Sequence, residues 1–236
     1  TWFYDNDGDN AGGGFAIVGD NSTLVMSDAT ISNNRTTSTF GGGGIFISNS
    51  GAVDIANSTF TNNSVSRYGG AAHIRGSRNV TIRDTLMLNN IANSGGDSIY
   101  SNGVSVINTD IPPVVLSQFI HIERTTMDSS GNSAMRFDGT SWEVYQNSTT
   151  TITKTLSILD SAIIANSLVA NEHAIVIQDV IEGFMIGTNQ AVMDVTTNID
   201  MSNVTISGFD QAMAYTTAFS NYSGPDDATL TTNLTL

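Results

Sequence analysis

The sequence predicts an all-β solenoid of about seven coils, and three observations point to it. The 236 residues include 22 glycines and a single lysine, Lys154. Asn, Asp and Gly favour turns, whereas Thr, Val and Ile favour strands. An asparagine pair or Asp/Asn run followed by glycines recurs at 3–17, 31–47, 60–74 and 87–100. Apolar residues alternate with polar ones beside these runs, as in strands that bury one face.

Each repeat contains two predicted strands. The first follows the glycines, reads small–apolar–x–apolar, and is placed at 14–17, 44–47, 71–74, 97–100, 134–137, 174–177 and 212–215. The second precedes the next corner and is placed at 24–31, 53–60, 80–87, 120–127, 156–163 and 199–206. A repeat of this length is typical of solenoids. Because one coil cannot bury a core alone, we expect coils to stack with parallel strands about 4.8 Å apart.

The recurring asparagines and glycines have structural roles in this interpretation. Glycine permits a positive φ angle or a close approach of two backbones at a corner. The asparagines Asn34, Asn63 and Asn90 are predicted to stack as a ladder in which each side-chain amide bonds the next.

Two short elements resemble a known family. Gly69-Gly70-Ala71 and Phe60-Thr61-Asn62-Asn63 resemble the GGA-I and F-x-x-N repeats of the chlamydial polymorphic outer membrane proteins. The wider V-x-I-x-[DN]-[ST]-x-F pattern resembles right-handed parallel β-helices, including autotransporter passengers, pectate-lyase-like enzymes and phage tailspikes. The resemblance covers nearly the whole chain and implies a right-handed parallel β-helix. It implies little about activity, because these motifs are structural.

One corner column avoids neighbouring acids. In successive coils it contains Asp28, Asn57, Asp84, Arg124, Asp160 and Asn203. Like charges about 5 Å apart repel by nearly 1 kcal/mol even in water. We therefore interpret the column as selected against stacked carboxylates, and not as a row of metal ligands.

The two ends of the sequence resemble interior coils. Phe3 occupies the column of Ile31 and Phe60, and Leu234 and Leu236 resemble the start of another strand. Solenoids need caps. We expect residues 1–236 to form a single segment of a longer solenoid.

Four long insertions interrupt the later coils, at about 101–119, 138–155, 178–198 and 216–233. We expect loops that leave the same corner and stack into a lobe, since insertions in repeat proteins often form a binding face. The aromatic residues Trp142, Tyr145 and Phe184 either contact a partner or glycan there, or pack the lobe onto the rod.

A basic cluster is a further candidate site. The arginines Arg75, Arg78 and Arg83, together with His73, form the basic cluster, which either contacts an acidic glycan or acidic protein surface, or relieves the surrounding negative charge.

Three alternate acids, Asp5, Asp7 and Asp9, resemble the start of a calcium loop. The EF-hand glycine and closing glutamate are missing from it. The alternatives are therefore a different calcium site or a polar corner, and no other cofactor is expected.

Four sequons are predicted to lie in loops and would be glycosylated in a eukaryotic secretory source, at Asn21, Asn79, Asn147 and Asn221.

Charge and hydropathy exclude some functions. A net charge of −14 with only eight basic residues does not provide the basic footprint of a nucleic-acid binder. No apolar stretch approaches the roughly 18 residues of a membrane span. The absence of cysteine fits a surface protein and leaves the redox compartment open. We expect an extracellular or cell-surface protein that associates with itself, with neighbouring surface proteins or with glycans.

Two functions remain. The first is a structural or adhesive rod in a surface layer, appendage or filament. The alternative is a polysaccharide lyase or glycoside hydrolase on the same fold. A hydrolase needs carboxylates about 5–10 Å apart on one face, and the sequence does not bring the outward acids Asp54, Glu123 and Asp138 together. We therefore expect a non-enzymatic protein.

Overall fold

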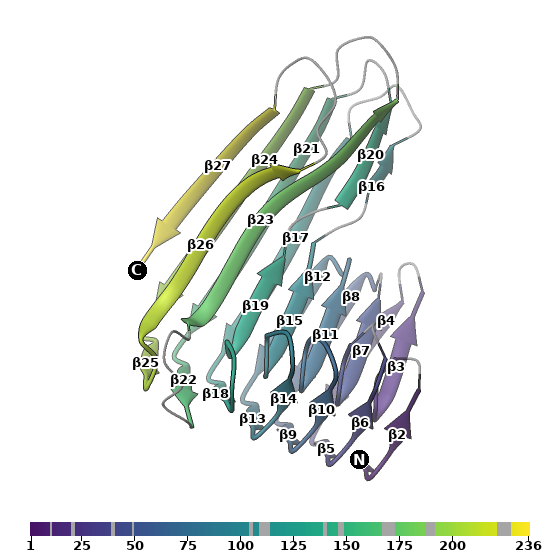
Figure 1. The fold of residues 1–236 in the computed structure, drawn as a ribbon, viewed down its shortest axis with the longest axis vertical. Coiled ribbons are helices and arrows are strands. Elements are labelled where there is room, and N and C mark those ends of the chain that lie inside the picture. The colour runs from purple at the N-terminus through teal and green to yellow at the C-terminus, as the bar shows by residue number, and fades with distance from the viewer. Residues whose placement is uncertain are drawn as a thin grey trace.

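The computed structural model of the chain is all-β, with strands stacked side by side along the molecule (Figure 1). It describes residues 1–9, 11–19, 22–38, 41–48, 50–103, 106–108, 114–138, 141–145, 149–166, 173–186, 192–220 and 228–236. These residues contain no helix, so none of them forms a helix that could cross a membrane.

The strands form four sheets, named A to D here. Sheet A contains β1 (Trp2–Tyr4), β5 (Thr30–Ser32), β9 (Thr59–Thr61), β13 (Leu86–Leu88), β18 (Thr126–Ser129), β22 (Ala162–Ala165) and β25 (Thr205–Ser207). Sheet B contains β2 (Asp7–Gly8), β6 (Arg35–Thr36), β10 (Ser64–Val65) and β14 (Ile91–Ala92). Sheet C contains β3 (Phe15–Val18), β7 (Ile45–Ser48), β11 (Ala72–Arg75), β15 (Ile99–Asn102), β16 (Val106–Asn108), β19 (Met135–Asp138), β20 (Ser141–Tyr145), β23 (His173–Ile186) and β26 (Gln211–Ser220). Sheet D contains β4 (Thr23–Ser27), β8 (Ala52–Ala56), β12 (Asn79–Arg83), β17 (Val114–Glu123), β21 (Thr149–Leu159), β24 (Val192–Ser202) and β27 (Ala228–Thr235).

The chain visits the sheets in a fixed order, from A to B to C to D and back to A, in each of its first coils. Each strand pairs in parallel with the equivalent strand of the next coil. In sheet D, for example, Ile55 lies across from Ile82, which lies across from Ile122. The inward columns of all coils join one apolar cluster, to which sheet A contributes Ile31, Phe60, Met87, Met127 and Ile163. The predictions of an all-β class and of parallel strands are confirmed.

The asparagine ladder lies inside the corner between sheets A and B. The side-chain amide Nδ2 of Asn34 donates to Oδ1 of Asn63 at 2.9 Å, and Nδ2 of Asn63 donates to Oδ1 of Asn90 at 2.9 Å. Each Nδ2 also donates to a backbone carbonyl, which for Asn63 is that of Ile31. Asn6 adds a further rung by donating to Asn34. All three predicted ladder asparagines are fully buried, so the ladder supplies the hydrogen bonds that this part of the interior requires.

The second predicted strand of each repeat is in fact two strands separated by a corner. The six residues of the corner column that runs from Asp28 to Asn203 have left-handed backbones, with φ angles of 45 to 53°. The first asparagine of each pair, such as Asn62 with a φ of 56°, is left-handed as well. Asn and Asp tolerate this conformation better than other residues with a side chain. One asparagine of each pair therefore turns the chain, and the other joins the ladder.

The alignment of one coil is also corrected. The sequence places Ile99 in the column of His73, but the structure pairs His73 with Tyr100. A one-residue shift moves a side chain to the opposite face of a strand. Tyr100 therefore lies in the outward column of sheet C with Phe46 and His73, and Ile99 joins the core.

Sheets C and D become much longer toward the C-terminus. The sequence predicts loops for the four insertions, but strands run through most of them: β17 and β21 pair over ten residues from Val114↔Thr150 to Glu123↔Leu159. Figure 1 shows β21, β23, β24 and β26 extending far beyond the ends of β4, β8 and β12. Two insertions in successive coils lie one strand spacing apart, so the backbone amides and carbonyls of one can pair with those of the other. A strand pairs these groups, whereas an irregular loop would leave many of them without partners.

The corner column that runs from Asp28 to Asn203 gives a first testable prediction. Arg124 donates from Nε to Oδ1 of Asp84 at 2.6 Å, and on the other side its column continues with Asp160. Changing Arg124 to aspartate places three acids in successive rungs, so this variant should melt at a lower temperature than Arg124→Asn. The difference between the two variants should shrink at high salt, because the charges are exposed and screened. Equal melting temperatures at low salt would contradict this account of the column.

Candidate functional site

Sheet B carries a polar groove on its outer face. The groove has a volume of about 310 Å³ and is lined by Arg35, Thr36, Thr37, Ser64, Val65, Ser66, Ile91 and Asn93. Its side chains come from equivalent positions in three coils, because Ser64 lies across from both Arg35 and Ile91. The groove therefore presents side chains from three successive coils, most of them polar.

A second cluster lies on the outer face of sheet C. The rings of His73 and Tyr100 meet edge to face with centroids 4.7 Å apart, and Tyr68 stacks on Tyr100 at 4.3 Å. The guanidinium of Arg136 lies 5.3 Å from the centre of the Tyr68 ring and also donates to Asp138 at 2.8 Å. The Tyr100 hydroxyl donates to the same carboxylate at 2.8 Å.

Burial fixes the ionisation of this cluster. Tyr100 is only 5% exposed, and burial, reinforced by Asp138, raises the pKa of its hydroxyl. Burial alone would lower the pKa of Arg136, but the hydrogen bond to Asp138, the charge of Asp138 and the neighbouring Tyr68 and Tyr100 together outweigh it and leave that pKa raised. Tyr100 therefore stays neutral and Arg136 charged. We interpret the cluster as a small outer core that joins coils, and not as a proton-transferring site.

The outward acids from the sequence analysis do not converge. Asp54 lies on β8 and forms an ion pair with Arg83 at 3.1 Å. Glu123 lies on β17 and pairs with Arg124. Asp138 lies on β19 in sheet C, a different face from the other two.

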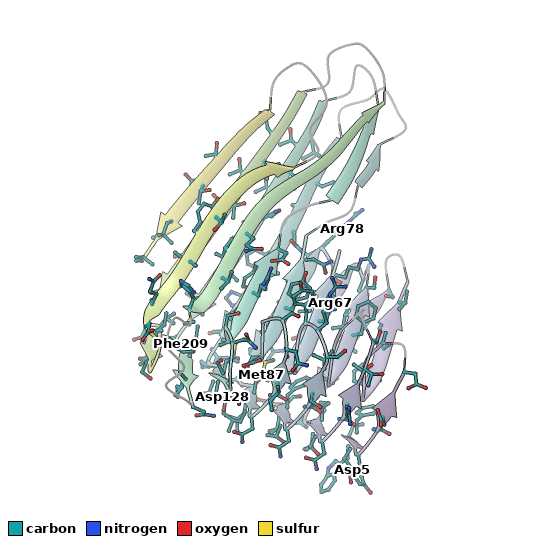
Figure 2. All side chains as sticks on the ribbon, in the orientation of Figure 1. Asp5, Arg67, Arg78, Met87, Asp128 and Phe209 are labelled. Atoms are coloured by element: carbon teal, nitrogen blue, oxygen red, sulfur yellow. The ribbon has the colours of Figure 1, made fainter. Side chains whose placement is uncertain are left out.

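The predicted basic cluster is divided. Arg83 pairs with Asp54, and His73 is buried beneath aromatic rings. Arg75 and Arg78 remain exposed at the turn between sheets C and D. Among the described residues, neither has an acidic partner. Figure 2 shows Arg78 at the upper end of the short strands.

The calcium candidates Asp5, Asp7 and Asp9 are not brought together as a metal-binding group. The described residues contain no cluster of three or more His, Cys, Asp or Glu that could hold a metal ion. Asp5 has a φ of 54° and turns the corner before β2. This corner breaks the strand alternation that would place the three carboxylates on one side.

The aromatic candidates all lie on the extension of sheet C. Trp142 and Tyr145 lie on β20, and Phe184 lies on β23 across from Glu143. Asn79 is exposed at the start of β12. The other candidate sequons, Asn21, Asn147 and Asn221, lie outside the described residues.

Two buried carboxylates lie outside the sites that the sequence indicated. Asp97 accepts hydrogen bonds from Ala92 N at 2.8 Å, from the Ser129 hydroxyl at 3.0 Å, and from the backbone amides of residues 130, 131 and 132. Asp97 occupies the position that Gly43 and Gly70 occupy in the two preceding coils. At those glycines the absence of a side chain leaves room for the next strand of sheet B. In the described residues sheet B ends at β14, and the Asp97 carboxylate occupies the end of that sheet.

The second buried carboxylate, Asp128, is 1% exposed. It accepts from the Asn89 amide at 2.8 Å and from the side chain of Asn166. Burial raises the pKa of both carboxyls, and in each case hydrogen bonds oppose the effect. The signal that would have found them is an acid at a position where the repeat otherwise requires a small or neutral residue.

These raised pKa values predict a pH dependence. A raised folded-state pKa contributes stability that is complete below the ordinary carboxyl value of about 3.8 and is lost as the pH rises through the raised value. Asp128→Asn keeps an acceptor for the Asn89 amide, replaces the oxygen that accepts from Asn166 by an amide nitrogen, and removes this contribution. The melting temperature of Asp128→Asn minus that of wild type should therefore be lower at about pH 4.5 than at pH 7. Exposed Asp200→Asn is the control, and an unchanged difference for Asp128→Asn would contradict the prediction.

Comparisons with known proteins give few matches, and these are weak. No family model and no curated protein matches the chain. A solved structure of the Streptococcus pneumoniae surface protein and adhesin PfbA is similar at a TM-score of 0.30 and 14% identity, covering 97% of this chain and 84% of that one. A second PfbA structure gives a TM-score of 0.28 and 13% identity, covering 92% and 77%. Likenesses this low carry no argument about this chain.

Proposed function

We propose that the chain is a right-handed parallel β-helix that serves as a structural or adhesive rod outside the cell. The cyclic order of sheets A to D and the single apolar cluster support the helical winding. The proposed rod presents a surface rich in Asn, Ser and Thr, with a net charge of −14, which favours solubility over non-specific collapse.

The observation that carries the functional proposal is the pairing of the outward acids. Asp54 and Asp138 are held by arginines on two different faces, and Glu123 is held by Arg124. A glycoside hydrolase needs two carboxyl groups that flank one glycosidic bond on the same face. Carboxylates tied to arginine within a repeating surface support a structural role instead.

The proposed contact surfaces are the groove on sheet B and the extension of sheets C and D. The groove offers hydroxyl, amide and guanidinium groups to a glycan. The extension carries Trp142, Tyr145 and Phe184, and its in-register strands provide a broad face for a neighbouring surface protein or a second copy.

Electron microscopy of the native source material tests this proposal. The expected result is the density of this chain repeated along a filament or surface layer, with ordered contacts at the extension. Discrete monomers that depolymerise uronic-acid polymers would contradict the structural role and support a lyase. A control digestion with Asp54→Asn and Asp138→Asn variants would locate any such activity.

A further inference from the structure

The first long strand of sheet D has an unpaired edge. On one side, β17 pairs with β21 along its whole length, from Val114 to Glu123. On the other side its pairing with β12 begins only at Phe119. The stretch Val114–Gln118 therefore lies beyond the end of the preceding coil, where the described residues provide no strand.

The direction of the backbone groups identifies which of them are unpaired. The Phe119 amide donates to the Arg78 carbonyl at 2.6 Å, so the backbone of Phe119 faces the preceding coil. Alternate residues of a strand direct their amide and carbonyl groups to the same side. Val115 and Ser117 therefore direct theirs to the open edge, where no hydrogen-bond partner exists among the described residues.

Within the part of the chain that the structure describes, this edge lacks the usual protection. Native proteins shield edge strands with charges, proline, bulges or a covering element. The sequence from 114 to 118 is Val-Val-Leu-Ser-Gln, a strongly strand-forming stretch with no charge and no proline. Val115 is 73% exposed and Phe119 is 40% exposed. Such an edge favours the addition of another strand.

Two unpaired arginines lie at the foot of the edge. The side chain of Gln118 donates to the Ser77 carbonyl at 3.1 Å, and Phe119 bonds Arg78. The carbonyls of Ser77 and Arg78 therefore contact β17 at the end of its open edge, and Arg75 ends β11 just before this turn. Both arginines are exposed, and neither has an acidic partner among the described residues, although the chain as a whole is strongly acidic.

We propose that the edge Val114–Gln118 binds an extended, acidic segment of a partner protein by strand addition. The backbone of that segment would pair with Val115 and Ser117, and its carboxylates would contact Arg75 and Arg78. Main-chain hydrogen bonds provide affinity in this mode, and side-chain contacts provide specificity. The inference rests on the proposed adhesive function and names the partner of its extension.

Fluorescence anisotropy with two labelled synthetic peptides tests the proposal on the full chain. Both peptides alternate threonine and valine; one ends in two aspartates and the other in two lysines. We expect the acidic peptide to bind and the basic one to bind at least about tenfold more weakly. Val115→Pro removes an amide that faces the open edge, where proline is tolerated, and should weaken binding at least about tenfold. Val115→Thr keeps the amide and should bind as wild type.

The arginines have their own variants. Arg75→Gln with Arg78→Gln should remove the preference for the acidic peptide, whereas Arg67→Gln, at an exposed arginine that lies over the Tyr68 ring, should leave it. Melting temperatures close to wild type would show that each variant is folded.

Three results would overturn the proposal: no binding of the acidic peptide, equal binding of the two peptides, or full binding by Val115→Pro. A dimer in sedimentation that Val115→Pro dissolves, without peptide binding, would assign the edge to a second copy instead. None of these results would contradict the structural rod itself, because the microscopy of native material involves no peptide.

Discussion

Replacing Asn63 with alanine is expected to lower the free energy of unfolding by about 4 kcal/mol. The Asn63 side chain is fully buried. Its Oδ1 accepts the Asn34 amide at 3.1 Å, and its Nδ2 donates to the Ile31 carbonyl at 2.9 Å. Without the side chain, both backbone groups lose these partners inside the core, and each unsatisfied buried group costs about 1–3 kcal/mol. The bonds to the neighbouring rungs are lost as well.

Urea denaturation followed by circular dichroism measures this change. The matched control is Asn93→Ala, because Asn93 is an exposed asparagine that lies on the outer face of sheet B. The control should remain within about 0.5 kcal/mol of wild type. A loss below about 1 kcal/mol for Asn63→Ala would mean that the ladder does not hold the coils together.

Replacing Gly70 with alanine is expected to be strongly destabilising, although it adds a single methyl group. A Cβ atom at this position would lie 2.7 Å from the Ile91 nitrogen and closer still to the Asp97 carbonyl oxygen. Both are backbone atoms, so no side-chain rotation relieves the clash. The neighbouring coil must move away, which breaks pairing in sheets B and C. We expect a loss of about 4 kcal/mol or more, or no soluble folded protein.

Gly131→Ala is the matched control for Gly70→Ala. A Cβ at Gly131 meets nothing within 4 Å, and the φ angle of this residue lies outside the left-handed region. The change should be neutral or stabilise the fold by up to about 1 kcal/mol, because alanine restricts the unfolded chain. Comparable melting temperatures for the two variants would contradict the close approach of coils at Gly70.

The repeating columns could be read from the sequence because each has one physical requirement. A buried amide ladder requires Asn, as at Asn63, and a close backbone approach requires Gly, as at Gly70. The inward columns require apolar residues, as at Ile55 and Ile82. These requirements recur in several coils, so a single sequence contains several independent copies of the same evidence.

Features that occur once could not be read in this way. Tyr100 lies one residue from its predicted register because Asp97 ends sheet B in the same coil and interrupts the pattern. The strands of the insertions lack the Asn and Gly corners that mark the other strands. Their β structure depends on pairing with another insertion, as at Val114 and Thr150, and this pairing is not visible in either segment alone.

The candidate site shows the same division. The sequence indicated a basic cluster at Arg75, Arg78 and Arg83, because proximity in sequence is enough to suggest it. It did not indicate that Arg83 is neutralised by Asp54 from the neighbouring coil, nor that the other two lie beside an unpaired edge. Those contacts depend on the register between coils, which differing insertion lengths obscure.

The central claim, that successive coils stack in parallel around one core, is tested most directly by amide-to-amide NOEs in a deuterated sample. The account predicts cross-peaks from the side-chain amide of Asn63 to that of Asn34 and to that of Asn90, which are 29 and 27 residues away in sequence. Cross-strand peaks between Ile55 and Ile82 should accompany them. Peaks that instead join consecutive strands in antiparallel register would show a meander and contradict the claim.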